Sequence, residues 1–442
     1  MIFSFLKYLQ PTNYFILPKK NGDFIFPIVD ETLKLNNPQI EEDLNYTSKI
    51  ARNYDFSWQV IQSGYIGNKV AYKSCNDVPI EDEYRFLRKN FNKVWVIYVY
   101  ILRIISFKNP IVETISFFKT KNVKRTTYLN QHKNYNSYLL FEGKLIKEEP
   151  LISVIIPTLN RYKYLEDVLK DLEKQTYKNF EVIIVDQTNP FKEDFYQGWN
   201  LNLNYWYQEE KALWKARNEA IKASKGEYVL LYDDDSLIDN DWIEQHIKGL
   251  DFFKADISSG VSISNIGAKV PENYSFFKVS DQLDTGNVLI KKEVFRKIGL
   301  FDRQFEKQRM GDGEFGLRSF LNNFKNISNP YAKRIHLKVS SGGLRQMGLW
   351  DAFSSNNFFG PKPVPSVLYF YRKYFGKYNT LLFLLKSLPK FILPYKFKNN
   401  RFFILLYLLL TVFMLPLTLF NILKSWKLSS RMLSKGEIIS TL

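Results

Sequence analysis

The chain has 442 residues, 45% of them hydrophobic and 24% charged, a balance that indicates a globular protein and excludes a largely disordered one. Its length predicts two or three folding units rather than a single domain. Cys75 is the only cysteine, so an intramolecular disulfide and a cysteine-ligated zinc site are excluded, and a reducing compartment is favoured.

The formal net charge of +17 is concentrated towards the C-terminus. Residues 361–442 carry 13 lysines or arginines and a single acid, Glu437, in a segment that is also strongly apolar. Basic residues interspersed with Leu and Phe indicate an anionic membrane surface as the partner, and no nucleic acid is expected.

Residues 1–148 mix aromatic and polar side chains with weak periodicity, and no chemistry can be assigned to them. Met1–Pro11 contains too short an apolar run for a secretory signal, so we do not expect export. Val94–Phe107 is a run of 14 residues with one charge, Arg103. It is too short to span a bilayer, and we expect a buried helix or strand, with an interfacial helix as the alternative.

From Leu151 onwards, apolar runs alternate with amphipathic segments, which predicts βα units around a parallel sheet. Strands are expected near 152–157, 181–186 and 228–232. Three aspartates follow the last of these strands directly: Asp233, Asp234 and Asp235. The carboxyl ends of such strands form the ligand crevice of open α/β sheets, so the acidic cluster is expected there.

Three adjacent carboxylates repel one another, and a divalent cation removes that cost. Oxygen ligands suit Mg²⁺ or Mn²⁺, which also bind phosphates. An isolated acidic triplet is more often a solvated turn. An EF-hand loop is disfavoured because Ile238 occupies the position that requires glycine.

The motifs around the three aspartates favour a cation site over a solvated turn. The sequence reads SVIIPTLN at 153–160, IIVDQT at 183–188, KARNEAI at 215–221 and GEYVLLYDDD at 226–235. These motifs in this order resemble the family 2 glycosyltransferases. The resemblance implies an α/β catalytic domain of the GT-A fold, with a Rossmann-like mixed sheet of the nucleotide-diphospho-sugar transferase type.

The predicted organisation has three regions. Residues 1–148 form an N-terminal accessory region, residues 149–350 the GT-A domain, and residues 351–442 a basic, apolar, membrane-associated helical tail. The tail contains Phe402–Leu423, 22 residues without a charge. This length suits a spanning helix, whereas Pro416 and the positive charges on both sides suit a membrane-embedded or interfacial hairpin, and both remain open.

The resemblance also implies roles for single residues. Asp235 is the expected metal ligand, joined by Asp233 and by His336, whose alternative role is structural. A loop after His336 is expected to meet the diphosphate through backbone amides and Arg345. The expected donor-nucleotide residues are Pro157, Thr158, Asn160, Asp186, Arg217, Asp233, Asp234 and Arg345.

The sequence TGNVLI at 285–290 and GDGEFGLR at 311–318 resembles the acceptor-side half of the family. Asp312 matches the base that deprotonates the acceptor hydroxyl. The family often has Glu-Asp there, whereas Gly311 precedes Asp312 in this chain. Gly286, Asn287, Glu314 and Arg318 are the further acceptor-side candidates; Glu314 and Arg318 could equally form an i,i+4 helix ion pair.

The expected protein is therefore an inverting glycosyltransferase that uses Mg²⁺ or Mn²⁺, a UDP-, dTDP- or GDP-sugar donor and a saccharide or lipid-linked acceptor, in surface glycan synthesis. We expect it on the cytoplasmic face of the cell membrane, held by a peripheral, monotopic or single-span C-terminal anchor. One alternative is a nucleotidyltransferase, which would need a glycine-rich basic loop after the first strand; residues 160–164 do not provide one. The other alternative is a non-catalytic membrane-surface scaffold. P-loop and dinucleotide motifs are absent from the sequence.

Overall fold

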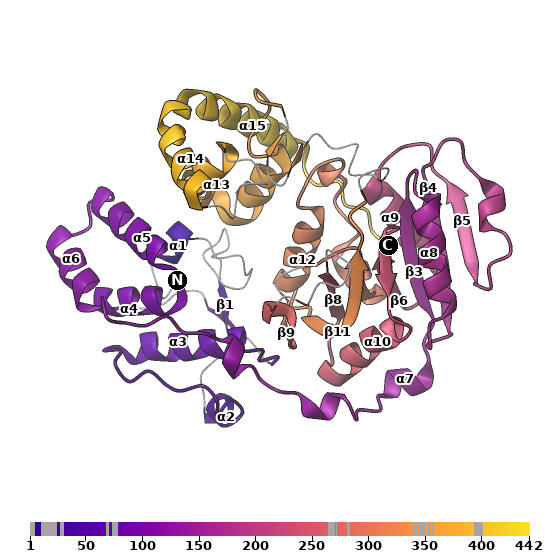
Figure 1. Ribbon diagram of the computed structural model, residues 1–442, viewed down its shortest axis with the longest axis horizontal. Helices are drawn as coiled ribbons and strands as arrows, with labels where there is room; N and C mark the ends of the chain where they lie inside the picture. Colours follow the sequence, from indigo (N-terminus) through magenta and orange to yellow (C-terminus); the bar gives the residue numbers. More distant parts are fainter. Residues whose placement is uncertain are drawn as a thin grey trace. The chain divides into compact units, whose positions relative to one another are not determined.

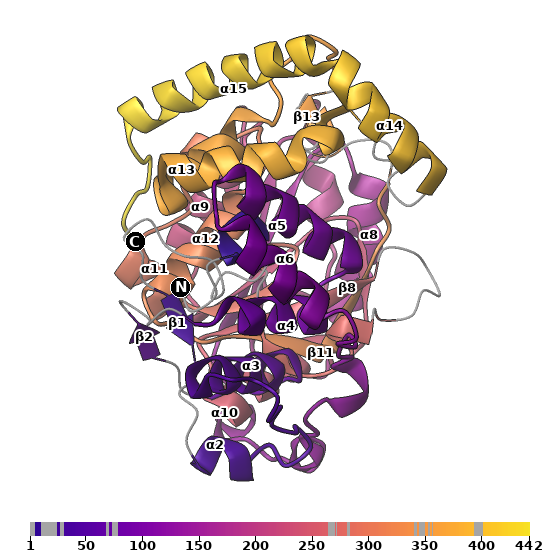
Figure 2. The ribbon, with the colours of Figure 1, turned by 90° about the vertical axis from the view of Figure 1, so that its left-hand side faces the viewer.

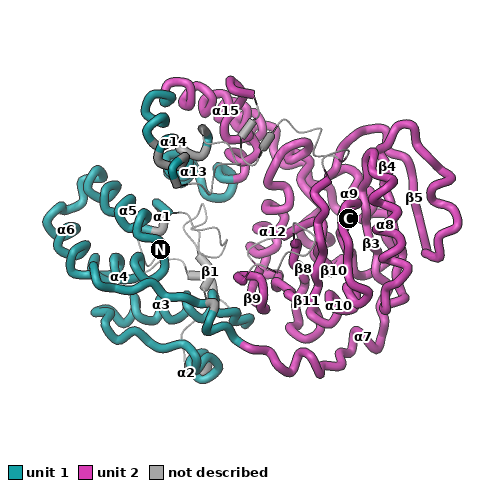
Figure 3. The backbone as a smooth tube through the Cα atoms, in the orientation of Figure 1, with its two compact units in different colours: residues 1–133, 371–415 teal, residues 134–370, 416–442 magenta. Residues whose placement is uncertain are grey.

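The chain forms two compact units in the computed structural model (Figure 3): residues 1–133 with 371–415, and residues 134–370 with 416–442. The structure describes residues 5–9, 24–26, 31–67, 70–72, 78–263, 270, 272–280, 283–339, 343, 350–351, 354–355, 357–392 and 401–442.

The first unit is mainly helical. Its elements are α1 (Leu6–Leu9), β1 (Phe24–Phe26), α2 (Glu31–Leu35), α3 (Lys49–Gln62), β2 (Val70–Tyr72), α4 (Ile80–Asn90), α5 (Lys93–Ile105), α6 (Pro110–Lys119), η2 (Leu129–Gln131), most of α13 (Pro365–Ile392) and α14 (Arg401–Phe413). β1 and β2 pair as an antiparallel ribbon. Part of the core is a cluster of Leu33, Ile40, Phe56 and Val60.

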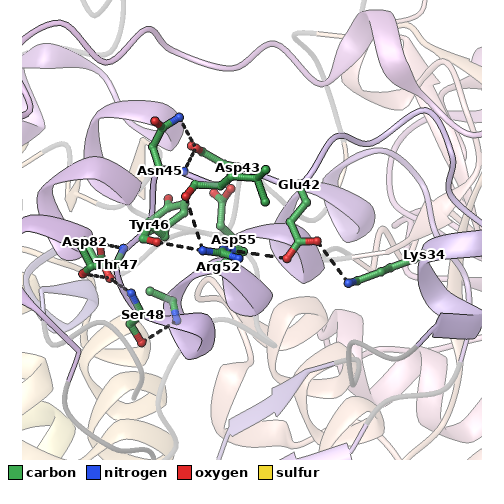
Figure 4. A network of polar contacts seen from close by, with 12 residues as sticks. Lys34, Glu42, Asp43, Asn45, Tyr46, Thr47, Ser48, Arg52, Asp55 and Asp82 are labelled. Atoms are coloured by element: carbon green, nitrogen blue, oxygen red, sulfur yellow. Dashed lines mark hydrogen bonds and ion pairs between the residues drawn. The ribbon is translucent and has the colours of Figure 1, made fainter.

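Polar contacts connect the loop before α3 to α4 (Figure 4). The buried carboxylate of Asp82 accepts hydrogen bonds from the Thr47 and Ser48 amides at 2.9 and 2.8 Å and from the Thr47 hydroxyl at 3.0 Å. Ser48 in turn caps α3. Asp43 in the same loop forms an ion pair with Arg85 at 2.7 Å. Charged groups of α4 therefore fix where α3 begins.

The expectation for Val94–Phe107 is only partly met. The segment forms a helix, α5, but only Val96, Val99 and Arg103 are buried, while Val94 and Ile105 are 67% and 64% exposed. One side of the helix packs in the unit, and the other carries apolar side chains on the surface.

The second unit is built on a nine-stranded mixed sheet (Figure 1) in the order β5-β4-β3-β6-β10-β8-β11-β7, with β9 paired to β11. The strands are β3 (Ile152–Thr158), β4 (Phe180–Asp186), β5 (Leu203–Tyr207), β6 (Tyr228–Tyr232), β7 (Ser236–Ile238), β8 (Ile257–Ile263), β9 (Lys278–Val279), β10 (Asn287–Lys291) and β11 (Asn326–His336). β3, β4, β5 and β6 run parallel, and β10 is antiparallel to β6 and β8. This confirms the predicted mixed sheet.

The helices α8 (Tyr162–Glu173), α9 (Leu213–Ala223), α10 (Trp242–Phe253) and α11 (Lys292–Ile298) pack against the sheet, while α7 (Lys144–Glu148) packs on α10 and α12 (Gly311–Leu321) on α11. The unit also contains the 3-10 turns η3 (Asn136–Tyr138), η4 (Glu193–Tyr196), η5 (Glu272–Tyr274) and η6 (Arg303–Phe305). β3 and β4 are buried along their whole length, as expected for central parallel strands. α9 packs on β3 and β4, and α10 on β8 and β11.

The C-terminal residues divide between the units. Residues 371–415 group with the first unit and 416–442 with the second, whereas the sequence predicted one region from 351 to 442; the predicted boundaries near 148 and 350 stay a prediction. α15 (Leu415–Lys435) and the residues after it hold to the second unit by hydrogen bonds. Gln304 donates to the Met432 carbonyl at 2.7 Å, and the Ile438 amide donates to Asp302 at 3.0 Å.

The uncharged stretch Phe402–Leu423 does not form one helix, because α14 ends at Phe413 and α15 begins at Leu415. A short antiparallel pair, β12 (Trp350–Asp351) and β13 (Ser354–Ser355), lies between the sheet and α13 in the sequence. Among the described residues, no helix has both the length and the apolar character needed to cross a bilayer.

Replacing Asp82 by alanine should destabilise the first unit. The substitution leaves the Thr47 and Ser48 amides without their buried acceptor, which costs about 1–3 kcal/mol. We expect a lower urea midpoint and faster amide hydrogen exchange in the peptide spanning residues 43–50. Glu41→Ala, an exposed acid in the same loop, should change the stability by less than about 0.5 kcal/mol. Unchanged exchange in Asp82→Ala would contradict this account.

Candidate active site

The three aspartates follow β6 directly, at its carboxyl end, as predicted. Asp234 and Asp235 are 4% and 2% exposed, and Asp233 is partly buried. Three carboxylates packed this closely need compensating charge, because burial and mutual repulsion both disfavour the ionised form. The compensation comes from three arginines on other elements.

Asp234 is held by residues at the end of β3. The Thr158 hydroxyl donates to Oδ2 at 2.8 Å, and Arg161 donates to Oδ1 at 2.8 Å. The same guanidinium nitrogen lies 3.1 Å from Oδ2 of Asp235. Burial raises the pKa of Asp234 to about 6, and the positive charge of Arg161 limits the rise.

Asp233 lies between two buried guanidinium groups. Arg217 of α9 donates to Oδ1 at 3.0 Å, and Arg334 of β11 donates to Oδ2 at 2.8 Å. Arg334 also donates to Asp284 at 2.9 Å. Burial by itself would raise the pKa of Asp284, but Arg334 holds that pKa below its ordinary value.

Asp235 lies beside the predicted histidine. β11 pairs with β7 so that His336 is opposite Ser236, and this register places Nε2 of His336 3.3 Å from Oδ1 of Asp235. Ligand atoms of Asp233, Asp235 and His336 all lie within 4.8 Å of one another, so the three side chains could share one metal ion. Carboxylate oxygens and an imidazole nitrogen suit Mn²⁺, and the carboxylates also suit Mg²⁺.

Gly286 is placed beside this cluster by the pairing of Asn287 with Tyr232 across β10 and β6. A methyl group on Gly286 would lie 2.1 Å from Oδ2 of Asp233 and 2.2 Å from a guanidinium nitrogen of Arg334. Both atoms belong to an ion pair with little freedom to move. Glycine is therefore required here for the close approach of the backbone to the carboxylate.

Asp186 ends β4, next to Thr158 of β3 in the parallel register. Its Oδ2 accepts hydrogen bonds from the hydroxyls of Tyr162 at 2.6 Å and Tyr196 at 2.8 Å, and Oδ1 accepts from the Thr188 amide at 2.8 Å. Burial and the Asp186 carboxylate raise the pKa of Tyr162 to about 12, so this hydroxyl remains a donor at neutral pH.

Asp312 lies in the first turn of α12 and is partly buried. Burial raises the pKa of its carboxyl. The Gly313 amide, which donates to Oδ1 at 2.7 Å, lowers that pKa and so limits the rise. The charge of Asp284 further raises the pKa of Asp312, and that of Arg217, which donates to Asp233, lowers it.

Other predicted residues have structural partners. The Asn287 amide accepts hydrogen bonds from Trp242 and His246 and donates to two backbone carbonyls, which connects β10 to its neighbours. Glu314 and Arg318 form the i,i+4 ion pair, at 3.1 Å. Their acceptor roles stay predictions.

The remaining predicted donor residues lie around the end of β3. Pro157 is inside that strand, and Asn160 follows it with a positive φ of 56° and donates its amide to Thr188. Arg345 lies outside the described residues.

Sequence reasoning missed three charged residues of the cluster: Arg161, Asp284 and Arg334. Each adjoins a predicted site residue in the chain, since Arg161 follows Asn160 and Arg334 lies two residues before His336. That adjacency was the available signal. The pairing of Arg334 with Asp233, 101 residues away, follows only from the sheet.

Known proteins share this part of the chain. A family model described as glycosyl transferase family 2 matches residues 153–308. Over 167 residues the chain is 28% identical to Glycosyltransferase GlyA of Streptococcus pneumoniae. The aligned region covers 36% of this chain and 22% of GlyA. Over 112 residues it is 32% identical to poly(ribitol-phosphate) beta-N-acetylglucosaminyltransferase TarS of Staphylococcus aureus. That aligned region covers 24% of this chain and 20% of TarS.

The chain is also similar to a crystal structure of TarS from Staphylococcus aureus in complex with UDP-GlcNAc, with 24% sequence identity and a TM-score of 0.36. The aligned part covers 44% of this chain and 60% of the TarS chain. The chain thus spans about a fifth of each of the two curated relatives, 22% and 20%. The sequence match includes the strands from β3 to β10 and the aspartate cluster. Residues 153–308 of the chain are therefore similar in sequence to glycosyl transferase family 2.

Proposed function

We propose that the chain is an inverting, cation-dependent glycosyltransferase that moves a sugar from a nucleoside-diphosphate donor to a saccharide or lipid-linked acceptor in surface glycan synthesis. The observation that carries this proposal is the buried cluster of Asp233, Asp234 and Asp235 with Arg161, Arg217 and Arg334. The domain match supports the reaction class.

The cation would be held by Asp235 and Asp233, with His336 as a third ligand. Their ligand atoms are close enough to share one ion, and their chemistry fits Mg²⁺ or Mn²⁺. When bound, such a cation offsets the negative charge that develops on the leaving diphosphate. Arg334 and Arg217 hold Asp233 from the other side, which fixes the orientation of its carboxylate before any donor arrives.

Asp312 is the proposed general base. Its raised pKa, due to burial, makes it a better proton acceptor than an exposed aspartate. In the proposed step the acceptor oxygen attacks the anomeric carbon, and its O–H proton passes to Asp312. The new C–O bond forms as the bond to the diphosphate breaks, and the nucleoside diphosphate leaves. One displacement from the opposite face inverts the anomeric centre.

The donor nucleoside is proposed to lie at the ends of β3 and β4. Asp186 and Thr158 are adjacent there, and the hydroxyls of Tyr162 and Tyr196 surround the Asp186 carboxylate. The donor could be a UDP-, dTDP- or GDP-sugar. The name of the relative TarS, an N-acetylglucosaminyltransferase, makes UDP-GlcNAc the first donor to test.

We also propose that the chain works on the cytoplasmic face of the cell membrane, where nucleotide sugars are made, with α14 and α15 contributing a peripheral contact. Large apolar side chains are exposed on α14, among them Leu409, Val412 and Phe413 at 61%, 71% and 82%. Lys424 and Lys427 of α15 are exposed as well. Apolar and basic groups together favour an anionic lipid surface.

The roles of Asp235 and Asp312 can be separated by two variants. Asp235→Ala should lose the Mn²⁺-dependent part of the UDP-GlcNAc thermal shift, because a cation ligand is gone. Asp312→Asn should keep that shift but lose sugar transfer by about 10²–10⁴-fold, because the base is gone. A nucleotide-sugar panel, read by thermal shift and by release of nucleoside diphosphate, measures both.

The matched control is Asp239→Asn, an exposed acid four residues beyond the cluster, which should behave like the unmodified chain. Transfer or donor hydrolysis that persists undiminished in both Asp235→Ala and Asp312→Asn would overturn these assignments. No donor binding in the unmodified chain would instead favour a non-catalytic scaffold.

Gly286→Ala should weaken Mn²⁺ binding at least tenfold, because the added methyl would displace the Asp233–Arg334 pair. Titration calorimetry with Mn²⁺ measures this directly. Gly198→Ala is the control, because nothing lies within 4 Å of the added methyl; unlike Gly286, Gly198 has a positive φ, of 81°, so its alanine variant also tests whether backbone strain by itself lowers the affinity. Equal Mn²⁺ affinity in the two variants would show that Gly286 does not shape the cation site.

The α14 contact predicts that Leu409→Gln, Val412→Gln and Phe413→Gln together reduce co-sedimentation with phosphatidylglycerol vesicles at least tenfold. Burying such side chains in lipid contributes about 1.5–3 kcal/mol each. Leu139→Gln with Leu140→Gln, equally exposed but elsewhere in the chain, should have little effect. Donor binding should be unchanged in all variants. Equal losses in the two sets would contradict a specific α14 contact.

A further inference from the structure

α5 and α6 form a helical hairpin in the first unit, residues 93–119, and lie side by side (Figure 2). Asn92 caps α5 through the Val94 amide. Asn109 caps α6 through two amides, and Pro110 occupies the first helical turn. The connection turns at Phe107, which has a positive φ of 57° and is 98% exposed. The local sequence therefore specifies two short helices with a sharp turn.

The inner side of the hairpin is fixed to α4 by buried charge. Arg103 forms ion pairs with Glu83 of α4 and with Glu113 of α6, the latter at 2.8 Å. The Tyr84 hydroxyl donates to Glu113 at 2.8 Å, and Arg88 donates to the Phe117 carbonyl at 2.7 Å. Both helices thus face α4 with buried polar groups. Their opposite sides face away from α4.

The outer side of the hairpin is apolar. On α5 the exposed side chains recur at helical spacing, and those on α6 do the same. Their exposed fractions are Val94 67%, Ile97 50%, Ile101 48%, Ile105 64%, Ile111 69%, Val112 41%, Ile115 56% and Phe118 59%. An exposed apolar surface of this extent on two helices that pack together indicates a binding surface.

Exposed positive charge surrounds this apolar surface. Between residues 93 and 125 the only acid is Glu113, which is buried in the ion pair with Arg103. The exposed charged residues of the segment are Lys93, Lys108, Lys121, Lys124 and Arg125, together with Lys119, which forms an ion pair with Glu81 of α4 at 2.8 Å. Trp95 and Tyr98, whose rings contact each other at 5.6 Å, lie partly buried on α5.

We infer that the outer face of the α5–α6 hairpin docks on an anionic lipid bilayer. The apolar side chains would enter the boundary between headgroups and acyl chains, and the surrounding lysines would meet lipid phosphates. A second copy of the chain fits this surface less well, because it would bring like charges together around an apolar contact. This surface is made by other elements than α14, and its docking does not depend on the enzymatic activity.

Site-specific fluorescence can test the docking in the full chain. Because Cys75 is the only cysteine, Cys75→Ser allows one dye to be placed by Ile101→Cys. With vesicles of phosphatidylglycerol and phosphatidylcholine, the dye at 101 should be quenched by lipids brominated on their acyl chains. The matched control is Leu44→Cys, 70% exposed in the same unit, whose dye should not be quenched.

Charge provides a second test. Lys121→Gln with Lys124→Gln should reduce vesicle affinity by roughly 25-fold, about fivefold for each basic residue at an anionic surface. Lys144→Gln with Lys147→Gln, exposed lysines of the second unit, should change it less than twofold. Equal losses in the two pairs would mean that only the total charge matters and would overturn the proposal.

Two further outcomes would overturn it. A dye at 101 that stays unquenched while the chain still sediments with vesicles would assign membrane binding to α14 and α15 instead. A dye whose emission shifts with protein concentration in the absence of lipid, together with dimers in sedimentation equilibrium, would make a second copy the occupant. Circular dichroism of each labelled chain checks that the hairpin is folded.

Discussion

The compensation of buried carboxylates by arginines from distant parts of the chain is the interaction on which the site depends. Asp233, Asp234 and Asp235 end one strand, and each would be costly to bury alone. Arg161, Arg217 and Arg334 reach them from the loop after β3, from α9 and from β11. Because these guanidinium groups leave a carboxylate oxygen of Asp235 facing His336, the cluster is stable as a protein core and still presents cation ligands at one place.

The mixed sheet makes this arrangement possible. A purely parallel sheet would supply only βα loops to the site, whereas β10 and β11 add backbone and side chains from antiparallel neighbours. The register of β10 with β6 brings Gly286 against Asp233, and the register of β11 with β7 brings His336 against Asp235. A slip of one residue in either strand would turn these groups to the other face of the sheet.

Outside the sheet, two helical segments share one pattern of buried polar and exposed apolar residues. The second unit buries polar residues of α15, such as Asn421 and Ser425, and exposes Leu423. In the first unit, the α5–α6 hairpin buries an Arg–Glu pair and exposes isoleucines. Inverted patterns of this kind, polar inside and apolar outside, are unfavourable in water and become favourable where the outer medium is lipid.

The sequence by itself determined the local elements and the order of the motifs. Apolar runs predicted β3, β4 and β6, and the aspartates were correctly placed at a strand end, because both depend on near neighbours in the chain. It could not determine which side of Val94–Phe107 is buried, since that follows from the pairing of Arg103 with Glu83 and Glu113. Nor could it show that Arg334 neutralises Asp233, or that Asn287 is held by Trp242 and His246. Those contacts join residues far apart in sequence, and only the register of the folded sheet and the packing of helices on it decide them.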